Sequence, residues 1–222
     1  MRYELQYRTV TVGLVPTGNR EAIRPFATDA LHDIYREITA DHPYSDFRLV
    51  AGGAAAQLHN GPRDLVTLDP RLLQVKTDIT LTPAMAQAKA LRILRLAAAR
   101  LNQDSFSQCG IQITAQSPTL ASFPSARGFI TEELMNAAGQ VRALGPGFFG
   151  CLQFRRQTSD SEEQLSIEPL QGDDRFMFLM LDLQREGPQQ VDELESWLID
   201  AFGFLRTRVA DLLSTSINQT GG

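Results

Sequence analysis

The sequence has no long hydrophobic run and lacks the features that mark export. Its most apolar stretch, residues 176–181, is much shorter than the roughly 20 apolar residues that a helix needs to cross a bilayer. Residues 1–7 alternate polar and apolar side chains, whereas a secretory signal has a basic start followed by an apolar segment. We therefore expect a cytoplasmic protein that does not associate with a membrane.

Cysteine is scarce, and basic residues are dispersed. The two cysteines, Cys109 and Cys151, each fall at the start of an expected strand, which favours buried free thiols over a disulfide. The 21 Lys and Arg residues form no run, and the formal net charge is −5. A general nucleic-acid binder needs a concentrated positive surface, so nucleic acid is not an expected partner.

Sequence motifs with a known chemical mechanism are also missing. The chain has no Gly-x-Ser-x-Gly nucleophile elbow, no P-loop and no EF-hand spacing. Its three histidines, His32, His42 and His59, have neither the HExxH spacing nor that of a facial triad, so we expect no metal site. We also expect no enzymatic activity, no catalytic residues and no cofactor.

The chain does contain an order of apolar patterns that occurs twice. With 43% hydrophobic and 21% charged residues, the composition is that of a folded globular protein. A strand, a helix, several strands and a second helix can be assigned in residues 3–101 and again in residues 109–213. The sequence predicts an α+β fold of two pseudo-repeated halves, with a mainly antiparallel sheet packed by helices. We place the halves at residues 1–104 and 105–222, as two units or as one continuous domain.

In the first half, residues 3–15 are rich in β-branched and aromatic residues and predict a long strand, with a bulge near residues 8–10 where the alternation changes phase. A helix is expected to end at Asp41, before Pro43. Short strands are then expected at residues 47–52, 54–59, 64–68 and 72–77. Thr82 followed by Pro83 predicts the start of a second helix, which reaches Leu101.

The second half begins with a strand at residues 109–115 that has one polar face. A helix is expected from Thr131 to Val141. Strands are then expected at residues 148–156, 164–170 and 175–184. The last of these is apolar on both faces, which predicts a central strand in a sheet that is covered on both sides.

The final helix has the strongest pattern in the chain. Val191, Leu194 and Leu198 begin an apolar stripe that continues to Leu212, and Trp197, Phe202 and Val209 widen it. A helix that is apolar over so broad an arc needs cover on more than one side, from both halves of this chain or from another subunit.

From this helix we predict a protein-binding or structural subunit of a bacterial-type multiprotein assembly. Its partner is expected to be another protein or a second copy of the chain. Trp197, Phe202 and Leu205 are the expected interface anchors, because buried aromatic and large apolar residues dominate interface energetics.

The alternative is an enzyme or small-ligand binder with a pocket between the two halves. His32, His42 and Asp46 are the expected ligand-binding residues in this case, because imidazole and carboxylate groups gather near the end of the first helix. A deep pocket with converging ionisable groups would favour this alternative. A shallow apolar surface would favour protein binding.

Overall fold

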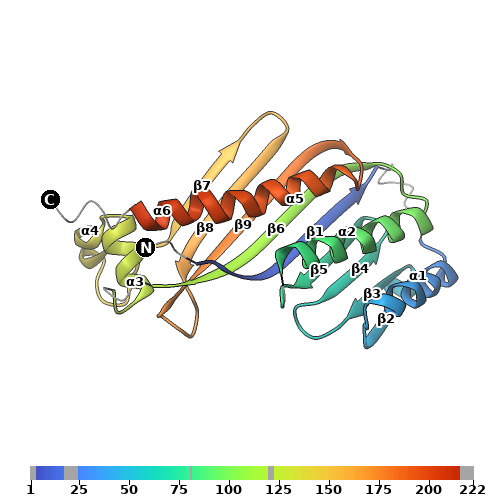
Figure 1. The fold of residues 1–222 in the computed structure, drawn as a ribbon, viewed down its shortest axis with the longest axis horizontal. Helices are drawn as coiled ribbons and strands as arrows, with labels where there is room; N and C mark the ends of the chain where they lie inside the picture. The colour runs from blue at the N-terminus through green and yellow to red at the C-terminus, as the bar shows by residue number, and fades with distance from the viewer. Residues whose placement is uncertain (1–3, 18–24, 81, 120–122, 216–222) are drawn as a thin grey trace.

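In the computed structural model, which describes residues 4–17, 25–80, 82–119 and 123–215, nine strands form one antiparallel sheet. The strand order is β2-β3-β4-β5-β1-β6-β9-β8-β7 (Figure 1). Strands from the two halves meet at the centre of this sheet, where β1 pairs with β6. The expected α+β fold with an antiparallel sheet is confirmed.

The first half follows the pattern of its sequence closely. Its elements are β1 (Gln6–Pro16), α1 (Thr28–Asp41), β2 (Asp46–Val50), β3 (Ala55–His59), β4 (Leu65–Asp69), β5 (Leu72–Asp78) and α2 (Pro83–Arg100). The register of β1 against β6 shifts between Tyr7 and Thr9, which is the expected bulge. The Thr82 hydroxyl accepts a hydrogen bond from the Met85 N–H at 3.2 Å, so the start of α2 is confirmed as well.

The second half agrees less well with its pattern. Its elements are β6 (Phe106–Pro118), α3 (Ala126–Gly128), η3 (Phe129–Leu134), α4 (Ala138–Ala143), β7 (Leu152–Gln157), β8 (Ser161–Pro169), β9 (Phe176–Gln189), α5 (Glu193–Phe204), η4 (Leu205–Val209) and α6 (Ala210–Thr215). The single helix expected from Thr131 to Val141 is wrong. Asn136 has a left-handed φ of 48°, and this conformation ends the first helical segment before α4 begins.

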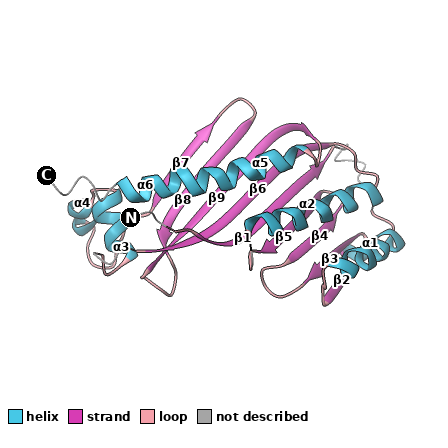
Figure 2. Cartoon of the chain, viewed as in Figure 1, coloured by secondary structure: helices cyan, strands magenta, loops and turns pink. Residues whose placement is uncertain are grey.

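Helices α1, α2, α5 and α6 lie on one side of the sheet, as Figure 2 shows. On that side Val12 and Ile113 are at most 1% exposed. The alternate residues of the strands point to the opposite side and stay partly exposed, among them Phe178 and Met180 of β9. The expectation that β9 lies in a sheet covered on both sides is therefore wrong, because α5 and α6 cover only one of its faces.

A single hydrophobic core joins the two halves. Its buried residues come from β1, β3, β4, β5, α1 and α2 in the first half, and from β6, α3, η3, β8, β9 and the last helix in the second. The position of each first strand is also similar, since β1 lies beside β5 and β6 lies beside β9. A boundary at residue 104 stays a prediction, and one sheet and one core cross it.

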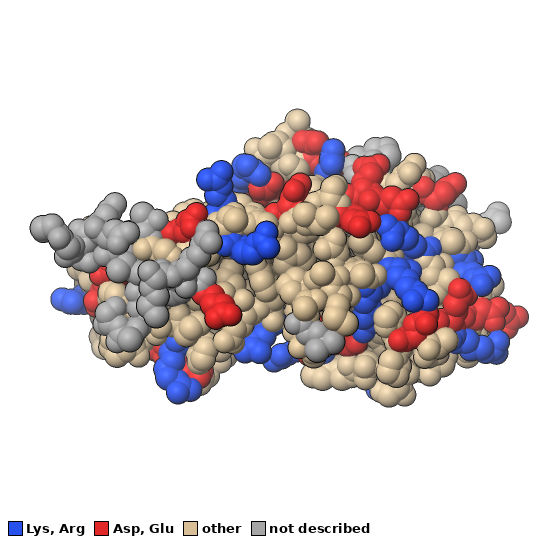
Figure 3. All heavy atoms as spheres, viewed as in Figure 1, with Lys and Arg blue, Asp and Glu red and all other residues tan. Residues whose placement is uncertain are grey.

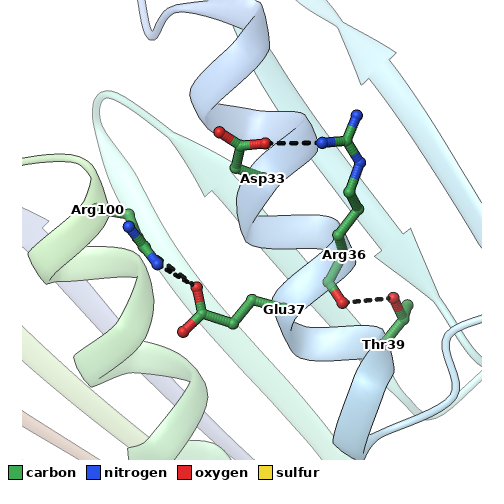
Figure 4. Close-up of polar contacts among 5 residues, drawn as sticks. All are labelled: Asp33, Arg36, Glu37, Thr39 and Arg100. Carbon is green, nitrogen blue, oxygen red and sulfur yellow. Dashed lines mark hydrogen bonds and ion pairs between the residues drawn. The ribbon is translucent and has the colours of Figure 1, made fainter.

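Helices α1 and α2 are joined by ion pairs on their outer sides. Figure 4 shows Arg100 of α2 beside Glu37 of α1, with 2.7 Å between the guanidinium and carboxylate atoms. Arg92 of α2 makes a second ion pair with Asp41 at the end of α1. Such exposed pairs contribute about 0–1 kcal/mol each, so they orient the helices more than they stabilise them. Positive and negative side chains are interleaved over this region in Figure 3.

Candidate functional site

The three expected interface anchors lie along the last helix and contact their own chain. Leu205 is 0% exposed and belongs to the core. The Phe202 ring packs edge-on against Tyr7 of β1, with 5.2 Å between ring centroids. Trp197 lies 5.4 Å from the guanidinium of Arg185 on β9 and is partly buried. Strands from both halves thus cover this helix. The sequence predicts cover either by both halves of the chain or by another subunit, and the structure has the first of these.

The three expected ligand-binding residues have separate surroundings. The His32 ring lies 4.9 Å from that of Phe47, and Asp46 makes a 2.5 Å ion pair with Arg48. His42 has a buried Nε2 atom without a hydrogen-bond partner, and burial is the main cause that lowers its pKa. Lys89 and Arg92 lower it further. The described contacts of His32, Asp46 and His42 are thus with different groups.

A buried polar cluster near His42 was not apparent in the sequence. The Tyr44 hydroxyl donates to Asp64 Oδ1 at 2.9 Å, and Lys89 Nζ lies 2.5 Å from Asp64 Oδ2. The same ammonium lies 4.9 Å from the centre of the Tyr44 ring. Burial, with the Asp64 charge, raises the pKa of Tyr44. These three groups satisfy one another, so the cluster joins α2 to the segments just before β2 and β4.

A hollow of about 280 Å³ lies on the uncovered face of the sheet, at the junction of the two halves. Residues of β1, β5, β6 and β9 line it. Gly13 of β1 and Gly110 of β6 face each other across the central strand pair and leave its floor without side chains. The hollow lies between the two halves, where the alternative interpretation places a pocket. None of the residues expected for that pocket, His32, His42 and Asp46, lines the hollow.

Uncharged amides surround this hollow. Gln74 pairs with Gly13 and Gln184 pairs with Gly110, so a glutamine lies on each side of the two glycines. Gln108 and Gln112 of β6 complete the set of four. In the sequence, period-two alternation places these glutamines on the polar face of their strands. It does not predict which strands are neighbours, so it cannot predict that the four glutamines surround one hollow.

The chemistry available in the hollow is hydrogen bonding. Asp182 is the only charged side chain among its lining residues, and Gln112 Nε2 donates to it at 3.5 Å. Cys109 also lines the hollow, but its residue is fully buried, and burial raises its thiol pKa to about 12. A thiol with so high a pKa is a poor nucleophile at neutral pH. This arrangement favours binding over catalysis.

A second surface of interest is apolar and lies around the connection between α4 and β7. Leu144 is 64% exposed, Phe148 61% and Phe149 41%. The Phe149 ring also packs 4.7 Å from the guanidinium of Arg127. We call Leu144, Phe148 and Phe149 the aromatic connection. Phe154 on the edge strand β7 follows it and is exposed as well.

The described residues contain no group of three or more His, Cys, Asp and Glu side chains that could hold a metal ion. Over the same residues, no helix is both long enough and apolar enough to cross a membrane. Cys109 and Cys151 are both free thiols, and Cys151 is exposed, so the expectation that both thiols are buried is wrong for Cys151. Comparison of the chain with protein-family models, with curated proteins and with solved structures finds no match.

Proposed function

We propose that this chain is a non-enzymatic, protein-binding subunit of a multiprotein assembly, and that the aromatic connection is part of its binding surface. The observation that carries the proposal is the exposure of two adjacent phenylalanines, Phe148 and Phe149. Each aromatic side chain buries about 150–250 Å² when it is covered, so leaving both in water forfeits much free energy. A partner that covers them would recover it.

The neighbourhood of the aromatic connection supports this proposal. Strand β7 forms one edge of the sheet, and among the described residues no strand lies on its outer side. Such an edge can pair with a strand of another chain. Phe154 on β7 is 44% exposed, which adds a third phenylalanine to this part of the second half. An apolar contact and backbone pairing could thus act together in one interface.

The last helix supplies further apolar side chains for a partner. Ile199 is 57% exposed and Phe204 is 39% exposed, whereas Leu205 is fully buried. We therefore extend the expected surface from Trp197 and Phe202 to Ile199 and Phe204. Leu205 stabilises the fold in this proposal and does not contact the partner.

The test uses the whole chain with Phe148→Asp and Phe149→Asp together. Native mass by light scattering reports self-association, and co-purification from the source cells reports a partner. We expect the double substitution to abolish the complex with little change in the unfolding midpoint, because both side chains are exposed. Met85→Asp is the matched control, since Met85 is 55% exposed on α2 of the first half. A wild-type chain that is monomeric and recovers no partner would contradict the proposal.

We also infer that the two halves are related by an internal duplication. The row Gln74, Gly13, Gly110 and Gln184 reads the same from either end across the centre of the sheet. Strand order is likewise symmetric, with the last strand of each half next to its first. A fragment of residues 1–104 should then dimerise through β1 in place of β6. A fragment that folds as a monomer with β1 at a free edge would contradict this inference.

A further inference from the structure

Two glycines in the middle of the sheet lack a structural explanation. Gly13 and Gly110 lie inside β1 and β6, and neither is among the described residues with a positive φ. A Cβ atom at Gly13 would lie 3.4 Å from Leu72 Cδ1, and one at Gly110 would come no closer than 3.9 Å to Leu183 O. Both are ordinary van der Waals distances. The backbone would therefore accept the Cβ atom of an alanine at either position.

These glycines also cost stability. Glycine inside a strand is destabilising relative to alanine, because its backbone loses more freedom on folding. Two of them side by side, in the central strand pair, double that cost. Glycine in a strand often marks a place where a ligand approaches the backbone closely. Here the pair provides the bare floor of the hollow.

The hydrogen-bonding groups around the floor define the ligand that would fit. Each glutamine amide offers two N–H donors and one carbonyl acceptor, so Gln74, Gln108, Gln112 and Gln184 together can both donate and accept. The Thr11 hydroxyl adds a group of the same kind. Hydroxyl groups of a ligand also donate and accept, so a neutral, hydroxyl-rich molecule matches this lining. The lining has no basic side chain for an anion, and its one carboxylate is a poor match for a cation.

We propose that the hollow binds a single sugar ring. A ring with flat C–H faces would lie on the backbone at Gly13 and Gly110, with Leu72 and Val15 beside it and its hydroxyls directed to the glutamines. The volume of about 280 Å³ lies just below the roughly 300–1,000 Å³ that is typical of ligand sites, which fits one ring better than a chain of them.

A peptide fits this place less well. The backbone N–H and C=O groups of β1 and β6 already pair with β5, with β9 and with each other. An incoming peptide would therefore find no strand edge here, unlike at β7. This site lies on the sheet face opposite the helices and does not depend on the aromatic connection.

The test measures sugar binding to the whole chain by ligand-observed NMR. The probes are glucose, galactose, mannose and N-acetylglucosamine, with glycylglycine and inorganic phosphate as competing ligand classes. We expect at least one sugar to bind at millimolar concentration, with neither competitor binding. Gly110→Val fills the floor and should abolish this binding while leaving the unfolding midpoint unchanged or raised, because valine favours strands.

Glutamine variants provide a matched comparison. Gln74→Ala or Gln184→Ala removes an amide of the lining and should weaken binding by about 2- to 13-fold, as expected for one hydrogen bond. Gln57→Ala is the control, because Gln57 lies in the same row across the sheet but two strands beyond Gln74 and outside the hollow. The proposal is overturned if no sugar binds, if a competitor binds instead, or if Gly110→Val leaves sugar binding unchanged in a folded protein.

Discussion

In the first half two helices, α1 and α2, lie over the sheet, and in the second half a single run from α5 to α6 does so (Figure 1). The first half joins its two helices by ion pairs, and the buried cluster of Tyr44, Asp64 and Lys89 joins α2 to the segments before β2 and β4. Its exposed large apolar side chains among the described residues are Leu49 and Met85. Those of the second half are Leu144, Phe148, Phe149, Phe154, Ile199, Phe204 and Leu212.

This difference shows that a similar order of elements does not fix how completely a sheet is covered. After its first strand the first half has the 14-residue helix α1, whereas the second half has only short helical segments, α3, η3 and α4, at the corresponding place in its order. Apolar side chains that a longer helix could cover are thereby left at the surface. For this reason we place the proposed protein contact in the second half.

The largest loss of stability should come from breaking the ion pair in the buried cluster of the first half. Asp64→Ala would leave the Lys89 charge without its partner, where the Lys89 side chain is only 17% exposed. We expect the free energy of unfolding to fall by about 3 kcal/mol or more, measured by urea denaturation. The double variant Asp64→Leu with Lys89→Met should recover much of this loss. A single variant as stable as the wild type would mean that the cluster does not hold α2 in place.

The next largest effect separates core from surface on the last helix. Leu205→Ala should lower the free energy of unfolding by about 2–5 kcal/mol, because it leaves a cavity at a fully buried site. Ile199→Ala on the same helix should change it by no more than about 0.5 kcal/mol. Native mass should be unchanged for Leu205→Ala. If Leu205→Ala stays folded but has a reduced native mass, Leu205 contacts the partner, as the sequence predicts.

Acid should weaken the first half through His42. Burial, together with Lys89 and Arg92, holds the pKa of His42 below its ordinary value, which the unfolded chain retains. Asp41 and Asp64 oppose this shift but do not reverse it. Between the two pKa values the unfolded chain binds more protons, so the free energy of unfolding should fall as the pH falls through about 6.5. His42→Gln should reduce this slope in urea titrations at several pH values, and an unchanged slope would count against it.

The smallest effect is a difference in thiol reactivity across the second half. Cys109 lies in the core with a pKa raised to about 12, whereas Cys151 is exposed beside the aromatic connection with a pKa raised by partial burial. Iodoacetamide should therefore label Cys151 in the native protein and label Cys109 only after unfolding. Mass spectrometry of the labelled peptides reads out both sites. If Cys109 and Cys151 were labelled equally in the native chain, Cys109 of β6 would not be buried in the core.

The sequence predicts the strands and long helices well because these depend on local periodicity. Alternation located β3 and β4 to within one residue, and the Thr82 cap located the start of α2. The segment after β6 was predicted poorly, since the helical pattern from Thr131 continues through Asn136 although the backbone turns there. Nothing in the local pattern distinguishes an asparagine in a left-handed conformation from one on a helix surface.

The candidate sites were harder to predict from the sequence than the strands and helices. The hollow depends on which residues of β1 and β6 face each other, and this register joins Gly13 to Gly110 across most of the first half. Asp64 and Lys89 likewise meet only after β4 and α2 have packed. Periodicity shows the face of an element on which a residue lies, whereas the partner of that residue depends on the fold as a whole.

The central position of β1 has a consequence for how this chain folds as it is made. Val12 of β1 pairs with Val75 on one side and with Ile111 on the other, so β1 is synthesised before either of its neighbours and must wait for both. Long-range pairings of this kind slow folding, and unpaired strand edges are prone to aggregate in the meantime. The middle of the sheet is thus made from a strand that is synthesised before both of its neighbours, and the second edge of that strand stays open until β6 has been synthesised.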